Sequence, residues 1–309
     1  MTALRLGTRA SALATAQATL VADAIKAASG RDVELVPVLS RGDVDTAPLT
    51  EIGGEGVFVT ALRQALVEGR VDAAVHSLKD LPTATPAGIT LAAVPAREDP
   101  RDVVVARDGL SLSQLPPGAV VGTGAPRRAA QLHALGFGLD VRPIRGNVDS
   151  RIAAVEAGTV DAVVLARAGL ARLGRLDAVS EVLDPLLMLP APGQGALAVE
   201  CRGNETVTTE LLATALDDPG TRCAVTAERT VLATLQGGCS APVGALADLA
   251  LGDDGDELWL RAVAVAPDGS RQVRLSTTGA PSDAELLGAS LAHRMIDEGA
   301  AGLFENDAS

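Results

Sequence analysis

The chain has 309 residues, of which 47% are hydrophobic and 21% charged, a balance typical of a globular protein with about two domains, or three small ones. Its net charge of −13 and aromatic content of 1% argue against nucleic-acid binding. No apolar run could span a bilayer, and residues 1–8 lack the layout of a signal peptide, so we expect a cytoplasmic protein without membrane contact.

The cysteines and histidines give no sign of a metal site or a disulfide framework. The three cysteines, Cys201, Cys223 and Cys239, are far apart and form no CxxC motif, which favours reduced thiols. The three histidines lie in separate segments without the spacing of metal ligands. We therefore expect no metal.

Strand and helix patterns alternate from the N-terminus to about residue 200. We predict strands at Leu4–Gly7, Val33–Leu39 and Val71–His76, and helices at Ser11–Ala28 and Phe58–Val67. Ser11 is a suitable N-cap for the first helix. This alternation predicts parallel sheets with crossover helices.

A weak internal repeat suggests that an α/β unit occurs twice. Gly69–Val75 is similar to Gly158–Val164, and each segment follows a predicted helix and enters an apolar strand. Chance similarity over seven positions is the alternative. Two such domains facing each other would form a cleft at the carboxyl ends of their strands.

The pattern changes after about residue 218. We predict a helix at Thr221–Leu235, paired strands at Glu257–Ala266 and Arg271–Thr277, and a closing helix at Ser282–Glu298. These elements indicate a small α+β domain at the C-terminal end.

Arginines gather at three predicted strand-to-helix junctions. The segments are Thr8–Ser11, Gly122–Arg128 and Arg145–Arg151, the last with Asp149 or Ser150 as N-cap. Helix N-termini and guanidinium groups both bind carboxylates and phosphates. One such loop is commonly a plain surface feature, but three favour a shared anion site.

Lys79 and Asp80 follow the strand Val71–His76, at its carboxyl end. A solvated turn is the simpler interpretation. In a cleft lined by arginines, Asp80 would be the obvious carboxylate to manage a positive charge or a proton. Gly53–Gly56 is either a mobile lid or an ordinary loop, and Gly193–Gly195 is typical of a hinge between domains.

Cys239 is the candidate for covalent chemistry. It lies in the loop Gly237–Pro242, where glycines precede the thiol and a proline follows it. Cys201 falls at an apolar strand and Cys223 on a helix, so we interpret these two as buried and inert.

Taken together, these segments resemble the porphobilinogen deaminase family. The similar motifs follow the family's order and spacing along the whole chain; they are Arg5–Ser11, Val71–Asp80, Arg97–Asp102, Arg145–Val148, Pro192–Ala196, Thr226–Arg229 and Gly237–Cys239. The resemblance implies two periplasmic-binding-protein-like α/β domains around a cleft plus a small α+β C-terminal domain. The implied boundaries are 1–95 with 196–214, 100–190, and 219–309.

The resemblance also implies a reaction. A dipyrromethane cofactor would be joined to Cys239 by a thioether, and four porphobilinogen units would be added in turn, each with loss of ammonia. Hydrolysis would release the linear tetrapyrrole hydroxymethylbilane and leave the cofactor attached. The implied enzyme is a monomeric transferase of tetrapyrrole (haem) biosynthesis.

The family's functional positions can be placed on this chain residue by residue. Asp80 would stabilise the azafulvenium-type cation left by ammonia and accept the proton lost later. The implied cofactor contacts, besides Cys239, are Ser77, Lys79, Thr123, Arg127, Arg128, Arg145 and Gly146. The implied substrate contacts are Arg9, Ser11, Arg151, Arg172 and Gln194.

Two places depart from the family pattern. Gly124 and Ala125 stand where serines are common, so two hydroxyl donors to the cofactor are missing. Glu51 and Glu55 stand in the glycine-rich segment where lysines are frequent, which argues against lid contacts with substrate carboxylates. The alternative from another class is a non-enzymatic two-domain anion-binding or receptor-type protein.

Overall fold

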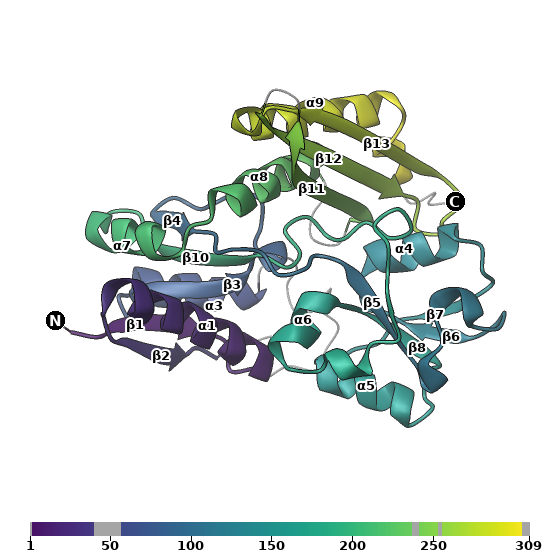
Figure 1. Cartoon of the computed structure of the whole chain (residues 1–309), viewed down its shortest axis with the longest axis horizontal. Coiled ribbons are helices and arrows are strands. Elements are labelled where there is room, and N and C mark those ends of the chain that lie inside the picture. Colours follow the sequence, from purple (N-terminus) through teal and green to yellow (C-terminus); the bar gives the residue numbers. More distant parts are fainter. Residues whose placement is uncertain (1, 40–56, 237–240, 253–254, 305–309) are drawn as a thin grey trace. The chain divides into compact units, whose positions relative to one another are not determined.

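The computed structural model describes residues 2–39, 57–236, 241–252 and 255–304 (Figure 1). The chain divides into two compact units, Met1–Glu98 with Ala196–Arg222, and Asp99–Gly195 with Cys223–Ser309. The three-domain boundaries expected from the sequence stay a prediction. No helix among the described residues has the length and apolar character needed to cross a membrane.

The first unit is built on a sheet whose described strands have the order β2-β1-β3-β10-β4. The strands are β1 (Leu4–Thr8), β2 (Val33–Pro37), β3 (Ala73–Ser77), β4 (Ile89–Ala93) and β10 (Leu197–Arg202). The helices are α1 (Ala12–Ser29), α3 (Val57–Val67) and α7 (Thr206–Leu216), and a 3₁₀ turn, Leu78–Asp80, follows β3.

Helices cover both faces of this sheet, because successive buried side chains along each strand point to opposite faces. Ile25 of α1 and Leu212 of α7 pack with Leu4 and Leu6 on one face. Leu62 of α3 packs on the opposite face. The predicted cap of α1 is confirmed, since Ser11 Oγ accepts a hydrogen bond from the backbone N–H of Ala14 at 3.3 Å.

The prediction of parallel sheets is wrong for part of the molecule. β1 pairs in parallel with β2 and β3, but β10 runs antiparallel to both β3 and β4. β10 joins the sheet from residue 197, far along the chain, so no crossover helix fixes its direction. This sheet is consequently mixed.

The second unit contains a sheet of the order β7-β6-β8-β5-β9. Its strands are β5 (Asp102–Ala106), β6 (Val120–Gly122), β7 (Asp140–Arg142), β8 (Ala162–Ala166) and β9 (Glu181–Val182). Its helices are α4 (Pro126–Ala134), α5 (Val148–Glu156) and α6 (Arg167–Arg172).

The weak sequence repeat reflects a repeated topology. Gly69 and Gly158 both adopt left-handed backbone angles, with φ of 68° and 71°, and lead into β3 and β8. Each of these strands lies in the middle of its sheet and pairs in parallel with the equivalent strand, β1 or β6. The two segments therefore hold the same place in two similar sheets.

The start of α5 differs from the prediction. Its N-cap is Asn147, not Asp149 or Ser150, because Asn147 Oδ1 accepts hydrogen bonds from the backbone N–H and the hydroxyl of Ser150, both at 2.8 Å. The helix accordingly begins at Val148. Asparagine, aspartate and serine are all good N-caps, so composition could not choose among them.

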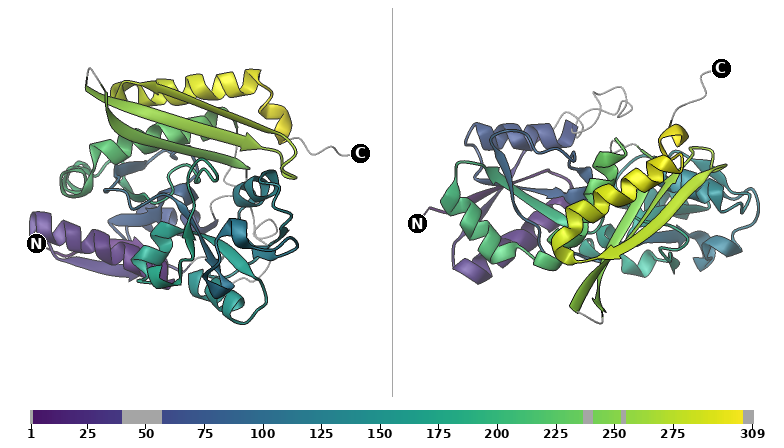
Figure 2. Two further views of the ribbon diagram at one scale, coloured as in Figure 1. Left: turned by 45° about the vertical axis from the view of Figure 1, so that its right-hand side comes forward. Right: turned by 90° about the horizontal axis from the view of Figure 1, so that it is seen from above.

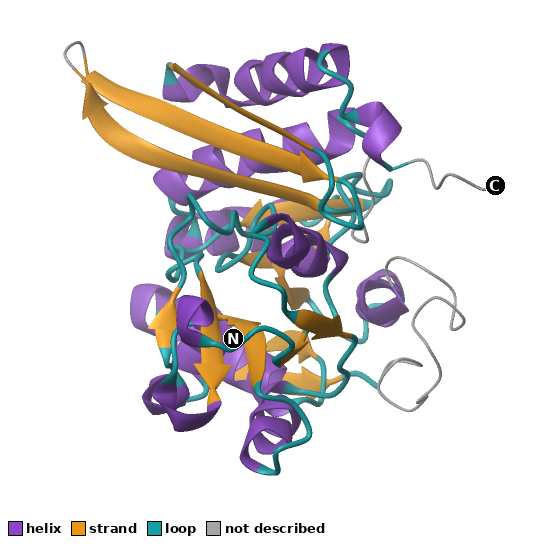
Figure 3. Cartoon of the chain, turned by 90° about the vertical axis from the view of Figure 1, so that its right-hand side faces the viewer, coloured by secondary structure: helices purple, strands orange, loops and turns teal. Residues whose placement is uncertain are grey.

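The rest of the second unit is α+β, as predicted. The antiparallel strands β11 (Val243–Gly252), β12 (Gly255–Val265) and β13 (Gln272–Gly279) form one sheet (Figure 3). Helices α8 (Pro219–Thr234) and α9 (Ala284–Asp297) pack on one face through Val231 and Leu291 (Figure 2). Ala130 of α4 packs with Val263 and Val265 on the opposite face, so this sheet supports the helix that carries Arg127 and Arg128.

Candidate functional site

In the first unit, two predicted site segments lie at one edge of the sheet. β1 and β3 are parallel neighbours, so the residues after them, Thr8–Ser11 and Ser77–Asp80, leave the sheet on the same side. A hydrogen bond of 3.0 Å from Gln17 Nε2 to Ser77 Oγ joins α1 to the end of β3. The structure thus brings Arg9, Ser11, Ser77, Lys79 and Asp80 to one edge.

The turn that carries Asp80 is held by a buried side chain and two backbone hydrogen bonds. Leu78 is fully buried, its backbone N–H donates to Ala196 O at 3.0 Å, and Leu81 N–H closes the turn on Leu78 O at 3.1 Å. Lys79 is half-buried, while Asp80 is exposed. A firmly held turn therefore presents a carboxylate to the outside of the unit.

The second unit gathers its predicted residues at the equivalent edge. β7, β6 and β8 are parallel, so the segments that follow them leave the sheet on one side. The predicted residues on these segments are Thr123, Arg127, Arg128, Arg145, Gly146, Arg151 and Arg172.

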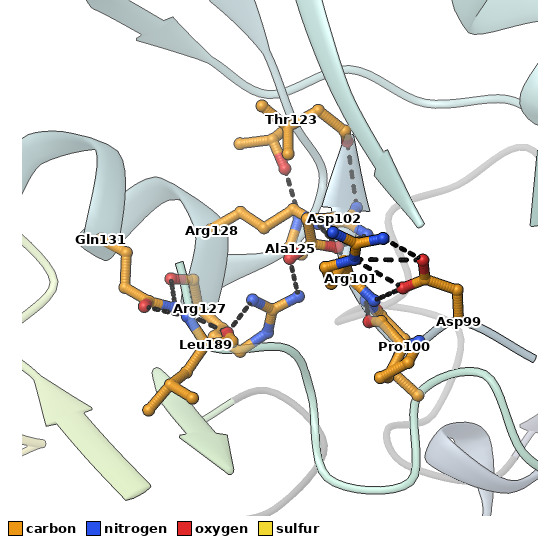
Figure 4. A network of polar contacts seen from close by, with 12 residues as sticks. Asp99, Pro100, Arg101, Asp102, Thr123, Ala125, Arg127, Arg128, Gln131 and Leu189 are labelled. Atoms are coloured by element: carbon orange, nitrogen blue, oxygen red, sulfur yellow. Dashed lines mark hydrogen bonds and ion pairs between the residues drawn. The ribbon is translucent and has the colours of Figure 1, made fainter. Parts of the chain in front are cut away.

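A buried cluster of three charged side chains lies beneath this edge (Figure 4). Arg128 donates to Asp102 Oδ1 through Nε at 3.2 Å and Nη2 at 2.8 Å, and to Val164 O at 3.0 Å. Arg127 Nη2 lies 2.8 Å from Asp102 Oδ2, an ion pair outside hydrogen-bond geometry, and its Nη1 donates to Leu189 O at 2.5 Å. The exposed fractions are 0% for Asp102, 4% for Arg127 and 5% for Arg128.

The charges in this cluster do not cancel. Burial opposes ionisation of Asp102, but Arg127 and Arg128 outweigh it and hold the pKa of this carboxyl well below its usual range. Burial and repulsion from Arg128 lower the pKa of Arg127, although guanidinium groups stay protonated in proteins. Among the described residues, two cations thus share one carboxylate, and a buried positive charge remains that an anion would neutralise.

Gln194 and Arg172 support the same region. Gln194 is 1% exposed, and its side-chain amide donates to Asp102 Oδ1 at 2.8 Å and to Pro100 O at 2.6 Å. Arg172 Nη2 donates to Gly195 O at 2.6 Å. The segment predicted as a hinge is therefore tied to the buried carboxylate on one side and to α6 on the other.

Arg151 adds a further cation that has no carboxylate partner among the described residues. It is half-buried, and its Nε donates to Gly146 O at 3.0 Å. Burial and the charge of Arg128 lower the pKa of Arg151. Within the described ranges, no carboxylate lies at ion-pair distance from it, so this edge of the second unit is suited to an anion with several carboxylates.

The loop at Gly124 and Ala125 is closely packed. Thr123 Oγ1 accepts a hydrogen bond from the N–H of Ala125 at 3.2 Å. A Cβ at Gly124 would lie 2.8 Å from Ile144 O, so glycine lets this loop approach the backbone that leads to Arg145. A serine at position 124 would therefore require this loop to move away from Ile144.

Several predictions fall outside the described residues, namely those on Cys239, Glu51, Glu55 and Gly53–Gly56. Of the other two cysteines, Cys201 is buried as predicted, whereas Cys223 is not fully buried. Burial raises the pKa of both thiols. No group of three metal-ligating side chains occurs in the part of the chain that the structure describes.

Sequence reasoning missed Asp102 and Gln131. Gln131 is 2% exposed. Its Oε1 accepts a hydrogen bond from Leu189 N–H at 2.9 Å, and its Nε2 donates to Leu189 O at 3.0 Å. Asp102 had a recognisable signal, since it opens the apolar strand Asp102–Ala106 next to the Arg97–Asp102 motif.

Comparisons with known proteins come to the same family from both parts of the chain. Residues 4–210 match "Porphobilinogen deaminase, dipyromethane cofactor binding domain", and residues 222–297 match "Porphobilinogen deaminase, C-terminal domain". The porphobilinogen deaminase of Mycolicibacterium paratuberculosis is 56% identical over 302 residues, covering 96% of this chain and 95% of that protein. Porphobilinogen deaminase 1 of Streptomyces coelicolor is 58% identical over 310 residues, with 97% of each covered.

A solved periplasmic substrate-binding protein from Coxiella burnetii is also similar. It has a TM-score of 0.44 and 14% identity, and the match covers 71% of this chain and 94% of that one. A likeness at this level carries no information on ligand or activity.

Proposed function

The chain belongs to the porphobilinogen deaminase family, and on that basis we propose that it is the transferase that joins four porphobilinogen molecules, with loss of ammonia, into hydroxymethylbilane for tetrapyrrole biosynthesis. The observation that carries the proposal beyond the family name is the buried surplus of positive charge around Asp102. Porphobilinogen and its oligomers bring an acetate and a propionate with every pyrrole ring, which is the anion that such a site requires.

The cofactor of this family is dipyrromethane, and the described residues fit it. Its two rings bring four carboxylates, while Arg127 and Arg128 share the single carboxylate of Asp102 within the described residues. When bound, dipyrromethane supplies the pyrrole carbon to which the first substrate is joined. We assign its covalent attachment to Cys239 and its contacts to Ser77, Lys79, Thr123, Arg127, Arg128, Arg145 and Gly146.

Guanidinium groups also serve the substrate in this proposal. Arg9, Arg151 and Arg172 would bind the acetate and propionate of the incoming porphobilinogen, because planar guanidinium groups pair with carboxylates in bidentate geometry. Ser11 would bind them through its hydroxyl. Ser11 Oγ already accepts the N–H of Ala14, so its hydroxyl proton is the part that can face a ligand. The contacts of Gln194 favour a supporting role through Asp102.

Asp80 is the proposed catalytic residue. Loss of ammonia leaves a cation on the substrate, and a carboxylate held on a firm turn would stabilise that charge. The same carboxylate would accept the proton released after the carbon–carbon bond forms. Exposure of Asp80 and burial of its neighbour Leu78 support this role, because the group is accessible while its backbone is fixed.

Asp80→Asn tests the proposed function directly. The variant should keep dipyrromethane on Cys239, as seen by intact mass, and lose nearly all consumption of porphobilinogen. Normal turnover by the variant would exclude Asp80 as the catalytic group. A wild-type protein that binds anions reversibly, consumes no porphobilinogen and is unaffected by Cys239→Ser would instead be a receptor-type protein.

We propose a cytoplasmic monomer that has no nucleic-acid partners. The net charge of −13 supports the absence of nucleic-acid partners, and the family resemblance supports a cytoplasmic monomer. Light scattering coupled to gel filtration should give the mass of one chain; twice that mass would exclude the monomer.

A further inference from the structure

A second buried ion cluster lies in the first unit and has no part in the proposed chemistry. Glu200 on β10 is 1% exposed in its side chain, and Arg63 of α3 binds it with both Nε and Nη2, at 2.9 and 2.7 Å. His76 on β3 is 4% exposed in its side chain, and its Nε2 lies 3.3 Å from Glu200 Oε2, outside hydrogen-bond geometry.

The three side chains meet because of the strand register. In the antiparallel pair β3–β10, His76 lies opposite Ala198 and Glu200 lies opposite Ala74, so His76 and Glu200 are diagonal neighbours on one face of the sheet. That face is the one covered by α3, where Ala74 packs with Leu62. Glu200 therefore links two central strands and the helix above them.

Glu200 is a permanent charge at neutral pH. Burial opposes its ionisation, but His76 and Arg63 outweigh burial and lower its pKa to about 2. A buried pair seldom adds stability beyond that of a well-packed apolar pair, whereas it defines position strictly, because displacing one partner leaves a buried charge unpaired. The cluster is thus better suited to fixing geometry than to adding stability.

The geometry that it would fix is that of Asp80. His76 is the fourth residue before Asp80, and β3 ends at Ser77, directly before the turn Leu78–Asp80. Directly beyond β3 and directly before β10, the turn is held by a hydrogen bond from Leu78 N–H to Ala196 O. A shift at the end of β3 would therefore displace the carboxylate of Asp80.

We propose that Glu200, with Arg63 and His76, is a positioning residue for catalysis: it locks the end of β3 against β10 and α3 so that the Asp80 carboxylate keeps its place. This inference rests on the proposed catalytic role of Asp80. Glu200 affects the rate of the chemical step and does not bind cofactor or substrate.

The test compares four variants of the full-length, cofactor-loaded enzyme: Glu200→Gln, His76→Gln, Asp72→Asn and Asp80→Asn. Asp72→Asn is the matched control, because Asp72 directly precedes the same strand β3 and pairs with Arg5 at 2.7 Å. For each variant, intact mass gives the cofactor-loaded fraction, and kcat and KM for porphobilinogen are expressed per loaded enzyme.

Glu200→Gln and His76→Gln should lower kcat by about tenfold to a hundredfold, the usual effect of misplacing a catalytic group by about 1 Å. Their KM values and loaded fractions should stay near those of the wild type, and Asp72→Asn should keep normal kcat. If Glu200→Gln fails to fold, His76→Gln decides, because it leaves the Arg63–Glu200 pair intact.

Two results would overturn the inference. The first is a wild-type kcat in Glu200→Gln, or in His76→Gln if Glu200→Gln does not fold. The second is an equal loss of kcat in Asp72→Asn, which would show a general effect of weakening β3. The Asp80→Asn variant separates this failure from that of the proposed function. Normal turnover in Asp80→Asn refutes the catalytic assignment itself, whereas an inactive Asp80→Asn beside a fully active Glu200→Gln refutes only the positioning role.

Discussion

Replacing Asp102 with asparagine should destabilise the second unit strongly. The change removes the carboxylate that both Arg127 and Arg128 contact and leaves two guanidinium groups, 4% and 5% exposed, side by side without a counter-charge. Removing one partner of a buried ion pair costs about 3–5 kcal/mol. Typical domains are stable by only about 5–15 kcal/mol, so the loss would be a large part of the total.

Equilibrium urea denaturation followed by circular dichroism would measure this loss. The control is Asp140→Asn, which breaks an exposed pair with Arg142 and should leave the unfolding midpoint nearly unchanged. Adding Arg128→Met to Asp102→Asn removes one of the two unpaired guanidinium charges and should recover part of the stability. A single Asp102→Asn variant as stable as Asp140→Asn would refute the claim that Asp102 balances the buried arginines.

Three further predictions concern charge. Arg151→Gln should raise KM for porphobilinogen more than it lowers kcat, because it removes a cation that has no carboxylate partner in the described structure; steady-state kinetics showing only a kcat effect would contradict this. Glu200 has a folded pKa of about 2 against an ordinary 4.5, so its contribution is present above pH 4.5 and lost as the pH falls toward 2. Urea titrations of wild type should show about 3 kcal/mol of this loss, and Glu200→Gln should lack it. Asp102→Asn should likewise flatten the decline in stability below about pH 4, since the folded pKa of Asp102 is strongly lowered and its stabilisation disappears on acidification; an unchanged acid profile would contradict that pKa.

Local signals in the sequence predicted local structure well. The cap at Ser11 and the alternating apolar runs each act over a few residues, so their elements could be placed. Strand direction depends on distant partners, which is why the antiparallel course of β10 was not predicted.

In the candidate site, too, local features were predicted and features that depend on distant residues were not. Arg127 and Arg128 were predicted from their position at a strand-to-helix junction, but their burial was not. The Arg97–Asp102 segment carries five charged residues in six positions and looks like a solvated loop. Only the packing of β5 beside β8 places Asp102 where it can neutralise an arginine.

We propose that a polypyrrole chain grows on a dipyrromethane held by Cys239. The most direct measurement is the intact mass of the purified protein, compared with that of Cys239→Ser. The claim predicts a wild-type mass greater than the polypeptide by two pyrrole units, further peaks at regular one-pyrrole intervals after brief exposure to porphobilinogen, and the bare polypeptide mass for Cys239→Ser. A wild-type protein that has the bare mass, both before and after exposure to porphobilinogen, would contradict it.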